Sequence, residues 1–285
     1  MLFDNRHPRY LPHVKNPEVL HMGLSPLAGG PWIETDKDLP RYHRHKLQQR
    51  ERLADRVYHA SPASGDAQRE LATILQRHLL EEQGDVYHAE DRDLCCSFAG
   101  IRVPFETDEP LWHASLLVAD DLVIMQEVGG EYRLTAASLC SPSHWRLEEK
   151  FEQPLRAIHD PIPGFHQALT PRIDRFFDHL RPEHPVVRYN WARQAHDALN
   201  QRPETEPDIT PESPLHYRTE RQSLVRLPRT RAIAFTIRVY LHPLESLAEV
   251  EGALPALFRA IDATPPPLYA YKGFDKLAPA LARYR

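Results

Sequence analysis

Residues 217–241, YRTERQSLVRLPRTRAIAFTIRVYL, contain the pattern that decides the fold. Two long runs, residues 217–227 and 231–241, flank the short connection Pro228-Arg229-Thr230 and predict a pair of antiparallel strands. In the second run, one face carries large apolar side chains such as Phe235 and Ile237, and the other carries small ones beside Arg238 and Tyr240. We expect the apolar face to pack on a core and the small-residue face to leave room for a ligand.

The surrounding segments add strands. Three are predicted, at residues 116–126, 132–139 and 185–191, the first two joined at Gly129-Gly130. Because the strands cluster without regular βαβ alternation, we predict a mixed α/β (α+β) fold, an antiparallel sheet with helices packed around it.

Helices are predicted from apolar spacing and from start signals. They lie at residues 66–83, after Ser141-Pro142-Ser143, after Thr170-Pro171, and at 244–263 with a break near Pro255. Residues 192–214 are polar and proline-rich and predict a long loop. The basic stretch 41–52 predicts a solvated helix face, with a docking surface for an acidic partner as the alternative.

Composition excludes several classes of protein. The 285 residues are 41% hydrophobic and 26% charged, which is ordinary for a globular protein. The formal net charge of -5 gives no electrostatic reason to expect nucleic acid or an anionic membrane as a partner. No apolar run approaches the ~18 residues of a membrane span, and the start lacks the apolar core of a signal peptide. Three cysteines, Cys95, Cys96 and Cys140, cannot build a disulfide framework, so we expect a soluble cytoplasmic protein.

Common cofactor and catalytic motifs are missing. The sequence has no G-x-G-x-x-G after a strand, no P-loop, no H-E-x-x-H, no C-x-x-C-H and no G-x-S-x-G. The 17 histidines make a metal or haem ligand available without singling one out. If the protein is a redox enzyme, its electrons must therefore come from another donor and not from a nicotinamide cofactor bound to this chain.

Five segments together resemble a known family. They are LCSPSHWR (139–146), AIHDPIPG (157–164), VRYNW (187–191), the block from YRTERQ (217–222) through RLPR (226–229) to FTIR (235–238) and Tyr240, and AYKGF (270–274). In this order and spacing they resemble the haem-dependent oxidative N-demethylase family, which includes the haem-bearing α subunit of dimethylamine monooxygenase. The resemblance runs from about Gly23 to Phe274. It predicts an irregular N-terminal arm at residues 1–22, one domain at 23–274 and a C-terminal tail at 275–285.

The resemblance implies a fold and an activity that composition does not show. It implies a PAS-like sheet with a haem pocket on it, holding non-covalent haem b through one protein ligand. It also implies a haem-dependent monooxygenase that removes a methyl group from a small secondary amine with O₂ and releases formaldehyde. Electrons would come from a partner flavin and iron–sulfur reductase subunit, in keeping with the absence of a dinucleotide motif.

Histidine is the expected axial ligand, because a working haem iron needs one strong donor and an open opposite side. His159 is the first choice as metal ligand, since it lies between Ile158 and a proline-rich turn that would hold the ring stiffly. His144, beside Trp145, is the rival, and His166 follows.

Arginines are expected at the haem propionates, because a guanidinium engages a carboxylate in bidentate fashion. The candidates are Arg146, Arg221, Arg226 and Arg238. Strand alternation places Arg221 on one face of the sheet and Glu220 and Arg226 on the other, so these residues cannot all contribute to one pocket. Arg238 is favoured because it shares the small-residue face with Tyr240. For each, the alternative is an ordinary ion pair or an exposed sheet side chain.

A small alkylammonium substrate needs a carboxylate or an aromatic wall. Glu220 is the predicted carboxylate and a candidate for proton transfer, with Tyr240, Trp191 or Tyr189 as the wall. Asn190 is predicted either to donate to a haem-bound ligand or to tie its strand to a loop. Lys272 with Gly273 is predicted to close over a phosphate or carboxylate. An ion pair for Glu220 and a core position for Trp191 are the structural alternatives. The competing functions are a haem-binding sensor or carrier without turnover and a metal-free PAS-like interaction protein.

Overall fold

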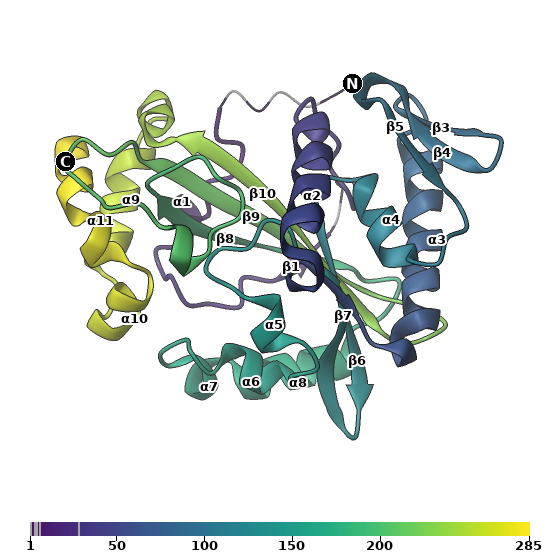
Figure 1. Ribbon diagram of the computed structural model, residues 1–285. Coiled ribbons are helices and arrows are strands. Elements are labelled where there is room, and N and C mark those ends of the chain that lie inside the picture. The colour runs from purple at the N-terminus through teal and green to yellow at the C-terminus, as the bar shows by residue number, and fades with distance from the viewer. Residues whose placement is uncertain (1, 3–4, 6, 28) are drawn as a thin grey trace.

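The computed structural model describes residues 2, 5, 7–27 and 29–285 (Figure 1). Among these residues it is a mixed α+β structure, with a seven-stranded antiparallel sheet in the order β1-β8-β9-β10-β6-β7-β2 and a separate three-stranded sheet β3-β4-β5. The predicted class, an antiparallel sheet surrounded by helices, is confirmed.

The strands of the large sheet are β1 (Ser25–Pro26), β2 (Tyr58–Ala60), β6 (Asp121–Val128), β7 (Glu131–Ser138), β8 (Val186–Gln194), β9 (His216–Arg226) and β10 (Ile233–Pro243). Those of the small sheet are β3 (Tyr87–Glu90), β4 (Asp93–Cys96) and β5 (Ile101–Pro104). The strands β9 and β10 pair over their full length, with Arg238 opposite Arg221 and Val239 opposite Glu220, so the predicted central pair is confirmed.

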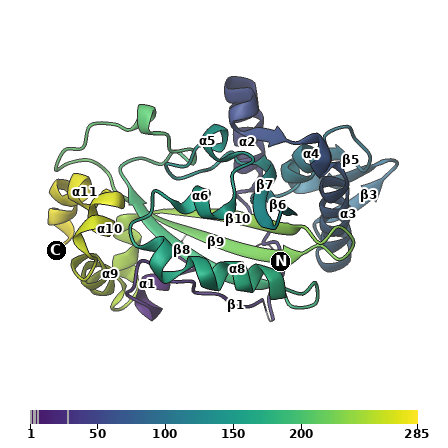
Figure 2. The same ribbon diagram turned by 90° about the horizontal axis from the view of Figure 1, so that it is seen from below.

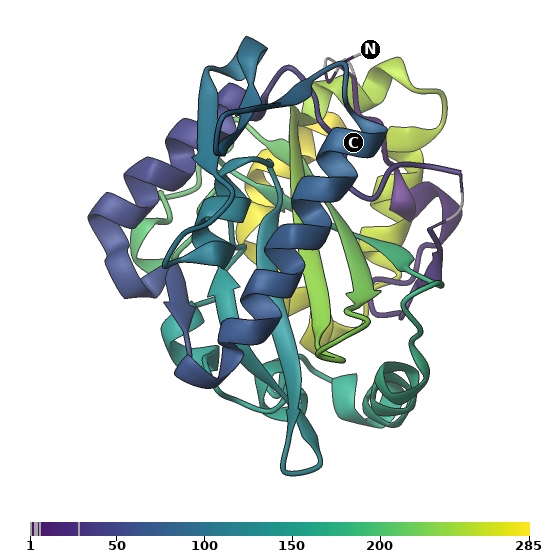
Figure 3. The ribbon, with the colours of Figure 1, turned by 90° about the vertical axis from the view of Figure 1, so that its right-hand side faces the viewer.

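The α-helices are α1 (Pro12–Lys15), α2 (Leu39–Leu53), α3 (Gly65–Glu82), α4 (Pro110–Leu116), α5 (Leu147–Lys150), α6 (Leu155–His159), α7 (Phe165–Ala168), α8 (Thr170–His179), α9 (Ala253–Asp262), α10 (Pro266–Tyr271) and α11 (Phe274–Leu281). Short 3₁₀ turns lie at Ala54–Arg56, Pro62–Ser64, Ser97–Ala99, Pro203–Thr205, Leu244–Glu249 and Ala282–Tyr284. The helices predicted near residues 66–83 and after Thr170 are confirmed. Figure 3 shows α3 running diagonally across the sheet.

The two faces of the large sheet are covered by different parts of the chain. We call the face that carries Ser223, Ala234 and Arg238 the α2 face, because α2, α3 and residues 32–36 pack on it. We call the face that carries Glu220, Phe235 and Ile237 the α6 face, because α5, α6 and α8 pack on it. Figure 2 shows α6 and α8 lying along strands β8, β9 and β10.

The expected core on the apolar face is present, but the expected room over the small-residue face is not. The small residues on the α2 face leave no open room, because Trp32 donates from Nε1 to Ser223 Oγ at 3.0 Å and Arg238 stacks on the Tyr42 ring at 4.0 Å. On the α6 face, Phe235 and Ile237 pack against the buried apolar cluster that includes Ile233, and both remain partly accessible. The space above small side chains on a strand can be filled by other parts of the protein as readily as by a ligand. Here the side chains of Trp32 and Tyr42 fill it.

Three local predictions are also corrected. The predicted strand 116–126 begins only at Asp121, because Pro110 starts α4 and the apolar residues before Asp121 are buried in the turn that follows it. Ser141-Pro142 starts no helix: the Asp121 carboxylate accepts the backbone N–H groups of Cys140 and Ser141 at 3.0 and 2.7 Å and holds this segment irregular. The predicted helical pair at 244–263 is present as the 3₁₀ turn Leu244–Glu249 and α9, but its break lies at residues 250–252. Pro255 lies in the first turn of α9, where a missing N–H costs nothing.

The basic helix α2 divides into an exposed and a buried side. Arg41, Arg44 and Arg52 are exposed, whereas Lys46 is fully buried and its Nζ donates to the carbonyl groups of Ser115, Val118 and Asp120. One basic residue of the stretch is therefore an anchor between α2 and the segment that leads into β6.

Helix α1 and the C-terminal helices α9, α10 and α11 lie at the left end of the sheet in Figure 1. Within the segment predicted as an irregular arm, His13 on α1 is buried against Tyr217, at 2.8 Å between Nδ1 and the hydroxyl. Of the segment predicted as a tail, most forms α11, whose Leu277 and Leu281 belong to a buried apolar cluster. Within the described part of the chain, no helix combines the length and apolarity needed to cross a membrane.

Candidate functional site

His159 is the last residue of α6 and lies over the α6 face. Its Nδ1 is 2.8 Å from the carbonyl oxygen of Leu155, and its ring stacks on Phe165 with centroids 4.2 Å apart and planes 6° apart. Burial lowers its pKa to about 4, helped by the charge of Arg188 and opposed by the bond to Leu155. The ring is therefore neutral at pH 7, with the proton on Nδ1 and the lone pair on Nε2, which is the form that ligates a metal.

The two rival histidines have other attachments. His144 has a left-handed backbone, φ 54°, an exposed side chain and an ion pair with Glu206 at 3.0 Å. In His166 both ring nitrogens are engaged, Nδ1 with Thr170 Oγ1 at 2.9 Å and Nε2 with Asp160 at 2.6 Å. His159 and His144 each keep Nε2 without a partner among the described residues, but only His159 has its ring held in place by both a backbone carbonyl and a stacked aromatic ring, whereas the side chain of His144 is exposed.

Glu220 lies on the α6 face at the centre of a polar cluster. It accepts hydrogen bonds from Arg218 Nε at 3.0 Å, from Gln222 Nε2 at 3.0 Å and from Asn190 Nδ2 at 3.4 Å. Burial opposes its ionisation, but Arg218 and the other donors outweigh burial and lower its pKa. Glu220 is therefore a buried carboxylate, and the predicted pair of Glu220 and Asn190 does lie together.

Two further cations join this cluster. Lys272, from the end of α10, has its Nζ 3.5 Å from Asn190 Oδ1, and burial lowers its pKa to about 8. Arg188 donates from Nη2 to the His21 carbonyl at 3.2 Å, while its buried Nε has no partner among the described residues. Because Glu220 is the carboxylate that acts on Arg188, Arg218 and Lys272 together, the cluster has an excess of positive charge.

Two of the predicted propionate ligands lie on the other side of the sheet. Arg221 donates to the carbonyls of Trp32 and Pro31, and Arg238 binds Asp36 at 2.5 Å. Both guanidinium groups are buried on the α2 face, so the sheet separates them from His159 and Glu220.

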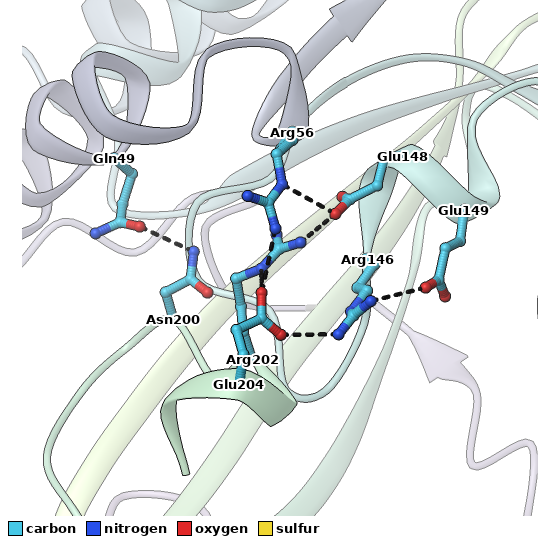
Figure 4. Close-up of polar contacts among 8 residues, drawn as sticks. All are labelled: Gln49, Arg56, Arg146, Glu148, Glu149, Asn200, Arg202 and Glu204. Carbon is cyan, nitrogen blue, oxygen red and sulfur yellow. Dashed lines mark hydrogen bonds and ion pairs between the residues drawn. The ribbon is translucent and has the colours of Figure 1, made fainter.

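The other two predicted arginines have protein partners as well. Arg226 donates to the carbonyls of Leu180, Phe177 and Arg231 and so fixes the end of α8. Arg146 belongs to a surface network of ion pairs shown in Figure 4, where it binds Glu149 at 3.2 Å and Glu204 at 2.8 Å.

The predicted aromatic wall does not meet the predicted carboxylate. Tyr240 donates to Glu34 on the α2 face, and Tyr189 packs there with Tyr10, with ring centroids 4.5 Å apart. Trp191 is stacked on Phe274 in a buried cluster. Strand alternation puts these three rings on the face opposite Glu220 and Asn190.

A mostly apolar hollow of about 550 Å³ opens beside the turn that follows α6. It is lined by Val19 and Leu20 of the N-terminal segment, by Pro163 and Gly164 of the turn after α6, and by residues 263–268 around the start of α10. The hollow therefore lies between the turn that follows α6 and the start of α10, and neither His159 nor Lys272 is among the residues that line it.

Comparison with protein families identifies the family of this chain. The chain matches the family model for haem-dependent oxidative N-demethylase, alpha subunit-like, over residues 23–282. The chain belongs to this family. The resemblance inferred from the five sequence segments is thereby confirmed, and haem dependence and oxidoreductase character follow from the family.

The residues of this N-demethylase-family chain fit a haem on the α6 face. His159 offers a neutral imidazole whose Nε2 is free to bind iron, and partly buried Phe235 and Ile237 offer apolar surface for a porphyrin. The unpartnered Nε of Arg188 and the nearby Lys272 fit anionic propionates.

Sequence reasoning missed Arg188 as a site residue. A signal was present, because Arg188 shares strand parity with Asn190 and is two residues away from it. What the sequence could not show is that α10 returns to the edge of β8 and places Lys272 beside the same group.

Proposed function

We propose that this chain catalyses oxidative N-demethylation of a small, dimethylamine-like alkylamine, using O₂ and releasing formaldehyde. The haem would be non-covalent haem b in a pocket on a PAS-like sheet, and the electrons would come from a partner flavin and iron–sulfur reductase. The observation that carries the proposal is the neutral, partly buried His159, whose ring is fixed by Leu155 and Phe165 with Nε2 left free. The family's alpha-subunit-like description supports a partner subunit.

Bound haem supplies the redox chemistry with O₂, and the protein supplies position and charge. His159 Nε2 would hold the iron, and its Nδ1–H bond to Leu155 keeps the ring oriented. Arg188 and Lys272 would neutralise propionates, which removes the cost of burying two cations near Arg218.

Glu220 is proposed to hold the substrate ammonium. Its pKa is lowered, so at neutral pH it is an acceptor and a counter-charge rather than a proton donor. Lys272, with a pKa of about 8, is the group beside it that can hold a proton at Nζ near neutral pH. Asn190 lies between the two and orients both.

The reaction balances with the proposed partners. An N-methyl carbon is hydroxylated with one oxygen atom of O₂, and the second oxygen leaves as water, with two electrons from the reductase and two protons taken up from solvent. The hydroxymethyl amine then breaks its C–N bond to give formaldehyde and the demethylated amine. Desolvation of the pocket keeps the ammonium at Glu220 away from competing water.

The test is a formaldehyde assay on hemin-loaded protein with a chemical reductant, O₂ and a panel of methylamines. We expect formaldehyde with at least one secondary amine, and a Glu220→Gln variant that keeps its haem absorbance but has a raised KM for that amine. A haem band that responds to gases while no amine yields formaldehyde would favour a sensor or carrier. A protein that takes up no hemin would overturn the proposal altogether.

A further inference from the structure

A second cluster of donor side chains lies on the small sheet β3-β4-β5. This sheet is at the opposite end of the molecule from α9, α10 and α11 (Figures 1 and 2). In the β3–β4 hairpin His88 is directly opposite Cys95, and Glu90 is two residues after His88 on the same face. The pairing itself brings an imidazole, a thiol and a carboxylate together.

The three donor atoms are close enough for one ion. The ligating atoms of His88, Glu90 and Cys95 all lie within 4.8 Å of one another. In a tetrahedral zinc site, bonds of about 2.0–2.3 Å put ligand atoms roughly 3.3–3.8 Å apart. Small side-chain rotations close this difference, and His88 and Glu90 are exposed and free to make them.

The present contacts show what holds the cluster together without an ion. Cys95 Sγ is 3.6 Å from Glu90 Oε2, with the thiol as donor. Arg102, directly opposite Cys95 on β5, binds Glu90 at 3.1 Å, Asp93 at 2.5 Å and Asp91 at 3.4 Å. Arg102 therefore binds Glu90, the carboxylate that a metal ion would need. If a metal ion displaced it from Glu90, Arg102 would still be paired with Asp91 and Asp93.

The donor set points to one class of metal. A thiolate with an imidazole suits zinc and similar borderline ions, whereas Mg²⁺ and Ca²⁺ prefer sites built of oxygen donors. Three protein ligands leave a fourth tetrahedral position for water.

We propose that His88, Glu90 and Cys95 form a binding site for Zn²⁺ or a chemically similar divalent cation, separate from the haem-family site. Binding releases the Cys95 thiol proton to solvent, forms the metal–sulfur bond and moves Arg102 from Glu90 to Asp91 and Asp93. The ion then ties β3 to β4 close to the tip of their hairpin, and it stabilises the hairpin by mass action.

The experiment is equilibrium dialysis of the full-length haem-loaded protein against ZnCl₂, with bound zinc counted by mass spectrometry. We expect one zinc per chain beyond the haem iron. His88→Ala and Cys95→Ser should each weaken binding on the order of 100-fold or more, since even second-shell changes cost 10–100-fold. His88 is exposed, so its variant tests the site without disturbing a core.

Two further variants sharpen the result. Arg102→Gln removes the competing cation and should tighten zinc binding about tenfold, while His179→Ala, an exposed histidine on α8, should change nothing. With Co²⁺ in place of zinc, a sulfur-to-cobalt charge-transfer band in the difference spectrum should appear in the wild type and be absent from Cys95→Ser. Zinc binding that survives both His88→Ala and Cys95→Ser, or no zinc bound by the wild type at micromolar free zinc, would overturn the proposal.

Discussion

The two faces of the large sheet carry similar residues and use them differently. On the α2 face, Arg238 and Arg221 are buried beside the carboxylates of Asp36 and Glu34. On the α6 face, Arg188 and Lys272 share Glu220 with Arg218, so positive charge is in excess. A buried cation that is paired with a carboxylate stabilises the fold. A cluster in which the cations outnumber the carboxylates indicates a site for an anionic ligand.

The same contrast holds for the neutral side chains. The α2 face is closed by Trp32 and Tyr42, while the α6 face keeps the apolar side chains of Phe235 and Ile237 partly accessible. Substitutions on the two faces should therefore separate stability from cofactor binding, and the predictions below are ordered by the size of the expected effect.

The largest effect is expected on the α2 face, from Arg238→Ala. This change leaves Asp36, which is 1% exposed, as a buried carboxylate without its cation, and should lower the free energy of unfolding by about 3–5 kcal/mol. Urea unfolding followed by circular dichroism measures this, with Arg41→Ala on the exposed side of α2 as the control. If both variants unfold at the same urea concentration, the α2 face does not hold the structural ion pair described here.

On the α6 face, His159→Ala should remove the proposed iron ligand. We expect hemin affinity to fall on the order of 100-fold or more, with a changed Soret band for any haem that still binds. His166→Ala is the matched control, because both nitrogens of His166 are engaged by Thr170 and Asp160. An unaltered spectrum in His159→Ala would transfer the ligand assignment to His144.

Arg188→Gln tests the charge excess with a smaller effect. Loss of one charge-assisted hydrogen bond to a propionate should weaken hemin binding about tenfold. Arg146→Gln should leave hemin affinity unchanged, because Arg146 is engaged by Glu149 and Glu204 at the surface (Figure 4). Titration of the apoproteins with hemin measures both. Equal losses in the two variants would show that the cation cluster has no special relation to haem.

The sequence predicted the sheet better than the site. The pairing of β9 with β10 could be predicted because apolar and polar residues alternate along both strands, and a shift of the register by one residue would move the apolar side chains to the other face. Which face is open was not readable, since that depends on where residues 32–36 and α2 pack, far away in the chain. His159 was identifiable from the family motif, whereas Lys272 becomes part of the cluster only through the tertiary return of α10 to Asn190.

The smallest effect concerns the pH dependence of stability that Lys272 causes. The pKa of Lys272 is lowered from 10.5 to about 8 in the folded protein, chiefly by burial. Between pH 8 and 10.5 the unfolded chain therefore binds more protons than the folded one, so this group makes the apoprotein more stable as the pH rises through that window. We expect a gain of about 1 kcal/mol between pH 8 and pH 9 in the wild type that is absent from Lys272→Met, measured by urea unfolding at each pH. Lys276→Met, on the exposed side of α11, should keep the wild-type slope. Hemin-loaded protein should lose the gain, because a propionate beside Lys272 restores its charged form; a slope that hemin leaves unaltered would place the propionates elsewhere.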